Sequence, residues 1–145
     1  MNIIKATKED AESVTNLALM LWPDHSLQEL YDDFYKMFDD DNCALFLVSQ
    51  NDTYIGFAQC QLRFDYVEGT NTSPVGYLEG IYILHDYRHM GVGRMLVTEC
   101  ERWSNTKGCL EFASDVEMGN LDSYYFHIKL GFREENRVIC FAKKI

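Results

Sequence analysis

A seven-residue turn near the middle of the chain, residues 88–94, has the composition of an anion-binding site. Gly91 and Gly93 lack the Cβ atoms that would hold a phosphate away from the backbone N–H groups. Arg88 and Arg94 add charge-assisted donors at the rim of the turn. Helical periodicity follows, and a helix N-terminus presents unpaired N–H groups and the positive end of the helix dipole. These residues predict a phosphate or pyrophosphate site.

The spacing of the glycines excludes two common phosphate-binding motifs. A Walker loop requires Gly-x-x-x-x-Gly-Lys followed by Ser or Thr, which the chain lacks, and the dinucleotide fingerprint requires a third glycine where this chain has Leu96. The pattern that remains is Arg88-x-x-Gly91-x-Gly93. Taken alone, two glycines between a strand and a helix fit a plain tight turn better than a phosphate site, and the spacing does not identify the anion.

Two carboxylates on predicted strands are the main candidates for acid–base chemistry. Glu79 interrupts an apolar strand, where a charged side chain is costly unless it is paired or functional, and Asp115 follows a second apolar strand. A carboxylate within hydrogen-bond reach of an ammonium group can hold it and accept its proton. Each residue also has a structural alternative. Glu79 could form an ion pair with Arg63, and Asp115 could cap a helix or form a turn.

Alternation, helical periodicity and turn residues predict the elements that position these groups. Capping-box patterns at Thr7 and Ser26 begin two helices, and Gly131 is placed to end the last one. The predicted elements are a strand at 2–6, helices after Thr7 and Ser26, strands at 44–50, 54–64 and about 75–84, a helix at 92–103, a buried strand at 110–113, a helix at 120–130, and one or two closing strands from Phe132. This order predicts a single α/β (α+β) domain over residues 1–145, with a mixed sheet covered by helices on both faces.

The composition limits the classes of partner. With 13 Lys and Arg against 23 Asp and Glu, the formal net charge of -10 has the wrong sign for binding nucleic acid or an anionic membrane, and it favours a cationic partner or simple solubility. No export signal and no apolar run of about 20 residues is visible. The five cysteines form no Cys-x-x-Cys pair, so we expect reduced thiols and a cytoplasmic protein. His85 and His89 have helical spacing but no third ligand, so we expect no metal site.

The turn and its flanking elements resemble the acetyl-CoA signature of the GNAT superfamily of N-acetyltransferases. The resemblance rests on Arg88-x-x-Gly91-x-Gly93 after the strand at 77–83, and on a final helix that begins at Asn120 and ends at residues 130–132. It implies a mostly antiparallel sheet in which the strand before the turn splays from the next strand and pairs with the pantetheine arm of acetyl-CoA. The implied cofactor contacts are Ile81, Tyr82, Ile83, Arg88, His89, Met90, Gly91, Val92, Gly93, Arg94 and Asn120.

Short stretches spread over the chain resemble one bacterial subgroup, the aminoglycoside 6'-N-acetyltransferases that confer antibiotic resistance. They are Leu21-Trp22-Pro23-Asp24-His25, Asp65-Tyr66-Val67-Glu68-Gly69, Ser73-Pro74-Val75, Leu78-Glu79-Gly80-Ile81 and Ala113-Ser114-Asp115. This resemblance implies direct acetyl transfer to the 6'-amino group of a polycationic aminoglycoside. The implied substrate contacts are Trp22, Tyr66, Glu79, Asp115 and Asn136. It favours Asp115 as the base, with Glu79 orienting the amine or sharing that role. Taken alone, Trp22 fits a staple between two helices, and Tyr66 fits ordinary loop packing.

One departure from the family pattern leaves the general acid open. Many members carry a tyrosine four residues before the Gly-Phe pair, as a general acid or thiol contact, but this chain has His127 there. Tyr124, Tyr125 or His127 could protonate the departing thiolate, or the thiolate could leave unassisted. A packed and hydrogen-bonded histidine is the alternative for His127. A covalent route through Cys109 would need a base beside the thiol, and none is evident.

A second departure concerns the C-terminal segment. Related sequences place an acidic residue near the position of Asn136, whereas this chain has Glu134 and Glu135 just before it. A substrate contact in this region could form across a dimer interface. Family habit and the strand-rich pattern of residues 137–145 predict a homodimer, through strand exchange or edge pairing.

Two other functions fit the same residues. The chain could acetylate another cationic amine, such as a polyamine or a protein lysine, since the carboxylates would hold any ammonium group. It could also be a non-catalytic acyl-CoA sensor, in which Glu79 and Asp115 are structural. Which aminoglycosides are preferred depends on the shapes of the loops, which the sequence does not predict.

Overall fold

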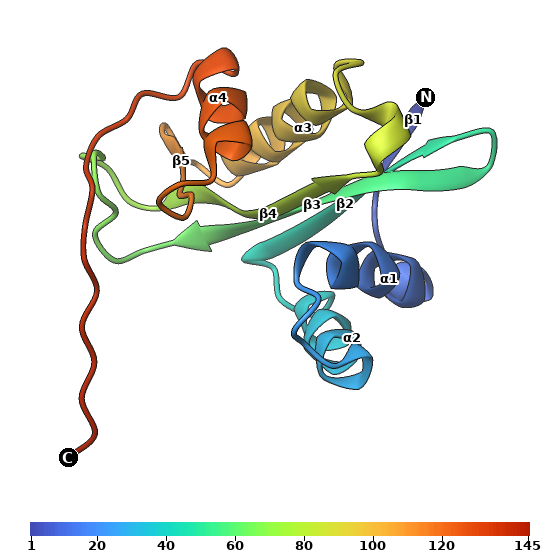
Figure 1. The fold of residues 1–145 in the computed structure, drawn as a ribbon, viewed down its shortest axis with the longest axis horizontal. Helices are drawn as coiled ribbons and strands as arrows, with labels where there is room; N and C mark the ends of the chain where they lie inside the picture. Colours follow the sequence, from blue (N-terminus) through green and yellow to red (C-terminus); the bar gives the residue numbers. More distant parts are fainter.

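The computed structural model describes all 145 residues, which form a five-stranded sheet with helices on both faces (Figure 1). Helices α1 and α2 lie on one face, and α3 and α4 lie on the other (Figure 1). The strands follow the order β1-β2-β3-β4-β5, and all neighbours are antiparallel except β4 and β5. The elements are β1 (Asn2–Lys5), η1 (Lys8–Asp10), α1 (Ala11–Leu21), α2 (Leu27–Met37), β2 (Cys43–Gln50), β3 (Thr53–Arg63), β4 (Val75–Ile83), η2 (His85–Tyr87), α3 (Val92–Thr106), β5 (Phe112–Ser114) and α4 (Leu121–Lys129). The predicted mixed, mostly antiparallel fold is confirmed.

Local sequence signals begin and join these elements. Thr7 and Asp10 form a capping box, in which the Thr7 N–H donates to Asp10 Oδ2 at 2.9 Å, ahead of α1. The Ser26 hydroxyl accepts a hydrogen bond from the Glu29 N–H at 3.1 Å and caps α2. The Asn-Asp pair at 51–52 has φ values of 51° and 61°, which a two-residue hairpin turn between twisted strands requires. The predicted helix starts and the hairpin are therefore confirmed.

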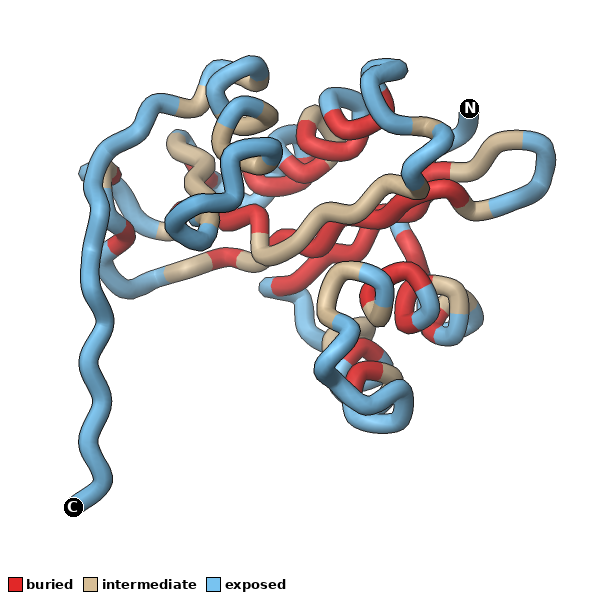
Figure 2. The backbone as a smooth tube through the Cα atoms, viewed as in Figure 1, coloured by how far each residue is buried: buried red, intermediate tan, exposed pale blue.

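The core lies on both faces of the sheet (Figure 2). On one face, Leu96 and Cys100 of α3 are fully buried against the central strands. On the other face, Phe57 of β3 is fully buried, and Phe34 of α2 packs edge-on against it with ring centres 6.4 Å apart. Residues 43–48 of β2 are buried throughout, because this strand is covered by helices on both sides. No helix is both long and apolar enough to cross a membrane.

The sheet changes geometry halfway along β4. β5 pairs with β4 only at residues 76–78, so the outer edge of β4 beyond Leu78 has no neighbouring strand. On the inner side, two consecutive residues of β3 pair with Leu78 and Gly80. Glu79 is therefore the extra residue of a β-bulge, a feature that redirects a side chain from the regular alternation of a strand. The open edge and the bulge occur at the same point of β4.

Two predictions for the C-terminal part are wrong. The closing strands expected from Phe132 do not form, and the last 13 residues, 133–145, extend away from the sheet (Figure 1). No element of the same chain covers this tail, so Val138, Ile139 and Phe141 are 63%, 82% and 91% exposed. The strand predicted at 110–113 spans Phe112–Ser114 instead. Leu110 is exposed rather than buried, because it precedes the residues that pair with β4.

Candidate active site

The glycine turn lies at the N-terminus of α3, as predicted. Gly91 precedes the first helical residue with a φ of 81°, in the left-handed region that favours glycine. A Cβ added to Gly91 would meet no atom within 4 Å, so the space beside the turn is open. The first N–H groups of α3 have no partner within the helix, and together with the helix dipole they fit a phosphate group. His89 also has a positive φ, of 60°.

Gly93 is required for helix packing, and its expected contact with the cofactor stays a prediction. A Cβ added there would lie 2.5 Å from a carbon of the Phe126 ring, so only glycine lets α3 approach α4 this closely. The two arginines at the rim are each anchored. Arg94 donates to the last carbonyl of α4 at 2.8 Å, and Arg88 Nε donates to the Ile83 carbonyl at 2.9 Å. Each guanidinium keeps further N–H donors that a phosphate can use.

The predicted backbone contacts for acetyl-CoA lie on the open half of β4. Ile81 and Ile83 pack toward α3, and Tyr82 packs toward α1. Because no strand pairs with the outer edge of this segment, its outward backbone groups can pair with an extended amide chain such as a pantetheine arm. The edge ends beside the N-terminus of α3, so one continuous surface offers backbone groups for the arm and N–H groups for the phosphates.

The remaining predicted cofactor residues differ in exposure. Met90 is exposed and Val92 is buried in the core below α3. Asn120 caps α4, where its side-chain oxygen accepts a hydrogen bond from the Ser123 N–H at 3.2 Å. The amide NH₂ of Asn120 makes no hydrogen bond within the protein and stays available for a ligand.

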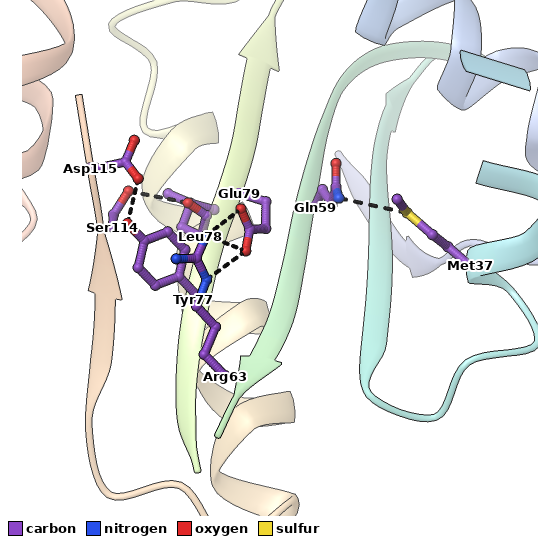
Figure 3. Close-up of polar contacts among 8 residues, drawn as sticks. All are labelled: Met37, Gln59, Arg63, Tyr77, Leu78, Glu79, Ser114 and Asp115. Carbon is purple, nitrogen blue, oxygen red and sulfur yellow. Dashed lines mark hydrogen bonds and ion pairs between the residues drawn. The ribbon is translucent and has the colours of Figure 1, made fainter. Parts of the chain in front are cut away.

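The two predicted carboxylates are connected through two other side chains (Figure 3). Arg63 Nε donates to Glu79 Oε1 at 3.0 Å, and Arg63 Nη2 donates to both Glu79 oxygens at 2.9 and 3.0 Å. The ion pair weighed as the structural alternative for Glu79 is therefore present. The guanidinium carbon lies 3.5 Å from the centre of the Tyr77 ring, and the Tyr77 hydroxyl donates to Asp115 Oδ2.

Tyr77 is a site residue that the sequence reasoning missed. Burial raises its pKa, and the hydrogen bond to Asp115 raises it further, so at neutral pH the phenol is protonated and donates. Asp115 Oδ1 makes no hydrogen bond within the protein, which leaves one carboxylate oxygen open. The sequence feature that could have identified Tyr77 is a polar ring two positions before Glu79 in an otherwise apolar strand.

Trp22 and Tyr66 differ in how they can meet a ligand. Trp22 is half-buried at the end of α1, with its ring edge-on to Phe57 at 6.3 Å. A Cβ added at Gly80 would lie 2.6 Å from the Trp22 ring, so this glycine lets the indole lie directly on β4 beside Glu79. Tyr66 is on the loop between β3 and β4 and is 76% exposed. Trp22 therefore forms a fixed wall, whereas Tyr66 presents a free aromatic surface.

Asn136 lies beside the same loop. Its side-chain amide donates to Glu68 at 3.2 Å. The adjacent Glu135 lies against Gly69, where an added Cβ would be 2.2 Å from the Glu135 Cγ. The start of the C-terminal tail thus crosses the loop that carries Tyr66. The predicted substrate contact at Asn136 stays a prediction.

The three candidates for the general acid have different partners. His127 Nδ1 lies 2.6 Å from a backbone carbonyl one turn earlier in α4, and its Nε2 lies 2.8 Å from the Ser114 hydroxyl. Both ring nitrogens are engaged, which favours the packed, hydrogen-bonded alternative for His127. Tyr124 donates to Glu134 at 3.2 Å, and this bond raises its pKa. Tyr125 is exposed, and its hydroxyl has no partner in the protein.

Two other chemistries find no support in the geometry. Burial raises the pKa of Cys109, the opposite of the shift that activates a nucleophilic thiol. No three His, Cys, Asp or Glu side chains are grouped so that they could hold a metal ion.

Comparison with known proteins identifies the family. The model of the Acetyltransferase (GNAT) family matches residues 11–132. The proteins called aminoglycoside N(6')-acetyltransferase type 1 of Acinetobacter genomosp. 13 and Salmonella enteritidis are each 38% identical, over 145 and 144 residues, with 100% and 99% of this chain and 99% of each relative covered.

Solved structures of similar proteins have the same fold as this chain. AAC(6')-Iy in complex with the bisubstrate analog CoA-S-monomethyl-acetylneamine has a TM-score of 0.96 at 37% identity, covering 99% of this chain and 98% of that chain. The apo structure of AAC(6')-IG from Acinetobacter haemolyticus has a TM-score of 0.95 at 36% identity, covering 100% of this chain and 99% of that chain. The resemblance expected from the turn at 88–94 is confirmed, and the chain belongs to the GNAT acetyltransferase family.

Proposed function

We propose that this chain transfers the acetyl group of acetyl-CoA to the 6'-amino group of aminoglycoside antibiotics, and thereby confers resistance to them. The observation that carries the proposal is the match, over the full chain, to aminoglycoside N(6')-acetyltransferases at 38% identity. The site supports it. Two carboxylates, an indole wall and an exposed tyrosine offer charge and stacking surfaces to a polycationic sugar.

Asp115 accepts the proton that must leave the amine before attack. A free amine is mostly protonated at neutral pH, and only the neutral form is nucleophilic. The open Oδ1 of Asp115 can bind the ammonium group and take its proton, directly or through a water molecule. The amine nitrogen then forms a bond to the thioester carbonyl carbon, and the bond from that carbon to sulfur breaks.

Backbone groups on the open half of β4 stabilise the charge that develops on the carbonyl oxygen. N–H groups held by a sheet cost no reorganisation when the oxyanion forms, which is why such donors lower the barrier. The N-terminus of α3 holds the phosphates of acetyl-CoA, as its exposed glycine turn allows. Of the acid candidates, Tyr125 has the hydroxyl without a partner in the protein, and the coenzyme A thiolate can also leave unassisted.

A panel of amines tests this function. We expect thiol release from acetyl-CoA with aminoglycosides that carry a 6'-amine, and none with aminoglycosides that carry a 6'-hydroxyl. Spermidine and a lysine-containing peptide belong in the same panel, because they represent other cationic amines. Turnover with either of these, and with no aminoglycoside, would sink the proposal.

A cytoplasmic location is part of the proposal. All five cysteines are free thiols, as expected for a protein of a reducing compartment. The net charge of -10 disfavours nucleic acid and anionic membranes as partners.

We also propose that two copies form a homodimer through the C-terminal tail. The outer edge of β5 has no neighbouring strand in its own chain, and an open groove of about 690 Å³ lies between the end of α3 and residues 109–112. The tail is extended, and Val138, Ile139 and Phe141 are exposed on it. An unpaired strand edge and an uncovered apolar segment in the same chain favour pairing between copies.

The tail should determine the oligomeric state. Sedimentation of the full chain is expected to give a dimer, and removal of residues 137–145 is expected to give a monomer. The variant Phe141→Asp, which places a charge on the apolar tail without shortening it, should weaken the dimer at least tenfold, because a buried unpaired charge is costly. A full chain that sediments as a monomer at tens of micromolar would contradict this part of the proposal.

A further inference from the structure

One guanidinium group connects the two carboxylates of the site. Arg63 is the last residue of β3, and its planar head contacts Glu79 through hydrogen bonds and the Tyr77 ring through its face. Tyr77 in turn donates to Asp115 (Figure 3). The contacts therefore run from Glu79 through Arg63 and Tyr77 to Asp115, and they link β3, β4 and the residue after β5.

We propose that Arg63 and Tyr77 are positioning residues for acetyl transfer, through which Asp115 is held as the proton acceptor and Glu79 as the orienting charge. The inference rests on the proposed function and deepens it, because it gives a structural reason why Asp115 is the base and why Glu79 does not share that role. Neither Arg63 nor Tyr77 needs to touch the substrate for this role.

The hydrogen bonds separate the two carboxylates. Both oxygens of Glu79 accept hydrogen bonds from Arg63, so neither is free to take a proton from the substrate. Asp115 has one oxygen engaged by a neutral phenol and the other open. The open oxygen of Asp115 is therefore the proton acceptor, while Glu79 stays in its ion pair. Arg63 also offsets one of the two negative charges, so the site is not left with two uncompensated carboxylates.

Tyr77 is held so that its hydroxyl has a fixed position. It is buried, and it packs in a small cluster with Val67 and Val75. Arg63 covers the ring with its guanidinium, an arrangement that combines cation–π attraction and stacking. A phenol fixed in this way selects one orientation of the Asp115 carboxylate, and so determines where the open oxygen lies.

The variant Tyr77→Phe removes only the hydroxyl and keeps the ring under Arg63. Because the Asp115 carboxylate loses the hydrogen bond that fixes its orientation, we expect kcat to fall about tenfold with KM for the aminoglycoside within about threefold. In the protein without substrate, the ¹³C NMR chemical shift of the Asp115 carboxylate at neutral pH should change as well, because the phenol no longer donates to it.

The matched control is Tyr54→Phe. Tyr54 also donates its hydroxyl to an aspartate, Asp10, at 3.1 Å, but at the other end of β3. The Tyr54→Phe variant should lower the melting temperature without changing kcat or the chemical shift of the Asp115 carboxylate. If Tyr77→Phe behaves like this control in every readout, Tyr77 is merely structural and the proposal is wrong.

Arg63→Lys tests the other half of the proposal. Lysine keeps the positive charge but lacks the paired N–H donors and the planar face of the guanidinium, so kcat should fall although the charge is conserved.

A double variant, Arg63→Lys with Tyr77→Phe, tests whether the two residues act together. Its fold-loss in kcat should be smaller than the product of the two single losses, because both residues act on Asp115 through the same contacts. If the two losses in kcat simply multiply, Arg63 and Tyr77 act independently and the proposed connection is wrong. The NMR measurement keeps this test separate from the proposed function. A wild-type protein without aminoglycoside turnover contradicts that function, whereas an unchanged chemical shift of the Asp115 carboxylate in Tyr77→Phe contradicts the positioning role.

Discussion

Replacing Asp115 with asparagine is expected to lower kcat for aminoglycoside acetylation by about 100- to 1,000-fold, because removal of a general base typically costs that much. The change is nearly isosteric. The amide oxygen can still accept the hydrogen bond from Tyr77, so the surrounding contacts survive while the proton acceptor is lost. Thiol release from acetyl-CoA under saturating substrate measures the effect directly.

Binding of coenzyme A provides the control for this variant. Calorimetry should give the same affinity for Asp115→Asn as for the wild type, since the turn at α3 is untouched. Asp41→Asn, which changes an exposed carboxylate in the connection between α2 and β2, should leave kcat unchanged. If the wild type binds coenzyme A and neither it nor the variant turns over, the protein is an acyl-CoA sensor. A kcat for Asp115→Asn within threefold of the wild type would assign the base elsewhere.

Replacing Phe57 with alanine is expected to reduce the free energy of unfolding by about 3–5 kcal/mol, the range for deleting a fully buried aromatic ring. Phe57 is completely buried in β3 and contacts the rings of both Phe34 and Trp22. Loss of the ring removes the support behind Trp22, so KM for the aminoglycoside should rise as well. Urea denaturation measures the stability, and steady-state kinetics below the unfolding transition measures KM.

Phe57→Leu separates the loss of the aromatic contact from the cavity, and Met20→Ala is the surface control. Phe57→Leu retains most of the volume and should cost less than about 1.5 kcal/mol. Met20→Ala deletes an exposed side chain on α1 and should change stability by no more than about 0.5 kcal/mol. A loss for Phe57→Ala as small as that of Met20→Ala would show that the core on this face is not organised around Phe57.

Local signals predicted most of the fold. Capping boxes, the hairpin pair at 51–52 and the glycine at 131 act over three or four residues, so their physical basis lies within the sequence itself. The closing strands could not be predicted in the same way. Residues 138–142 form an apolar run with the β-branched and aromatic residues that favour a strand, but a strand needs a partner edge, and the chain does not bring its own tail to one.

The site was predictable in its residue types but not in its connections. Glu79 and Asp115 stood out because charged residues are rare in apolar strands. Their linkage through Arg63 and Tyr77 depends on the register of β3 against β4, which no local pattern specifies. The same holds for Gly93, whose contact with Phe126 joins two helices that are far apart in the sequence.

The bulge at Glu79 has a consequence for how this enzyme can change. Leu78 and Gly80 pair with consecutive residues of β3, and Leu78, Ile81 and Tyr82 keep their places in the two faces of the sheet. The side chain at position 79 therefore belongs to neither core. A substitution there leaves the packing intact but deprives Arg63 of its ion-pair partner, so a change of acceptor at this site requires residues 63 and 79 to change together.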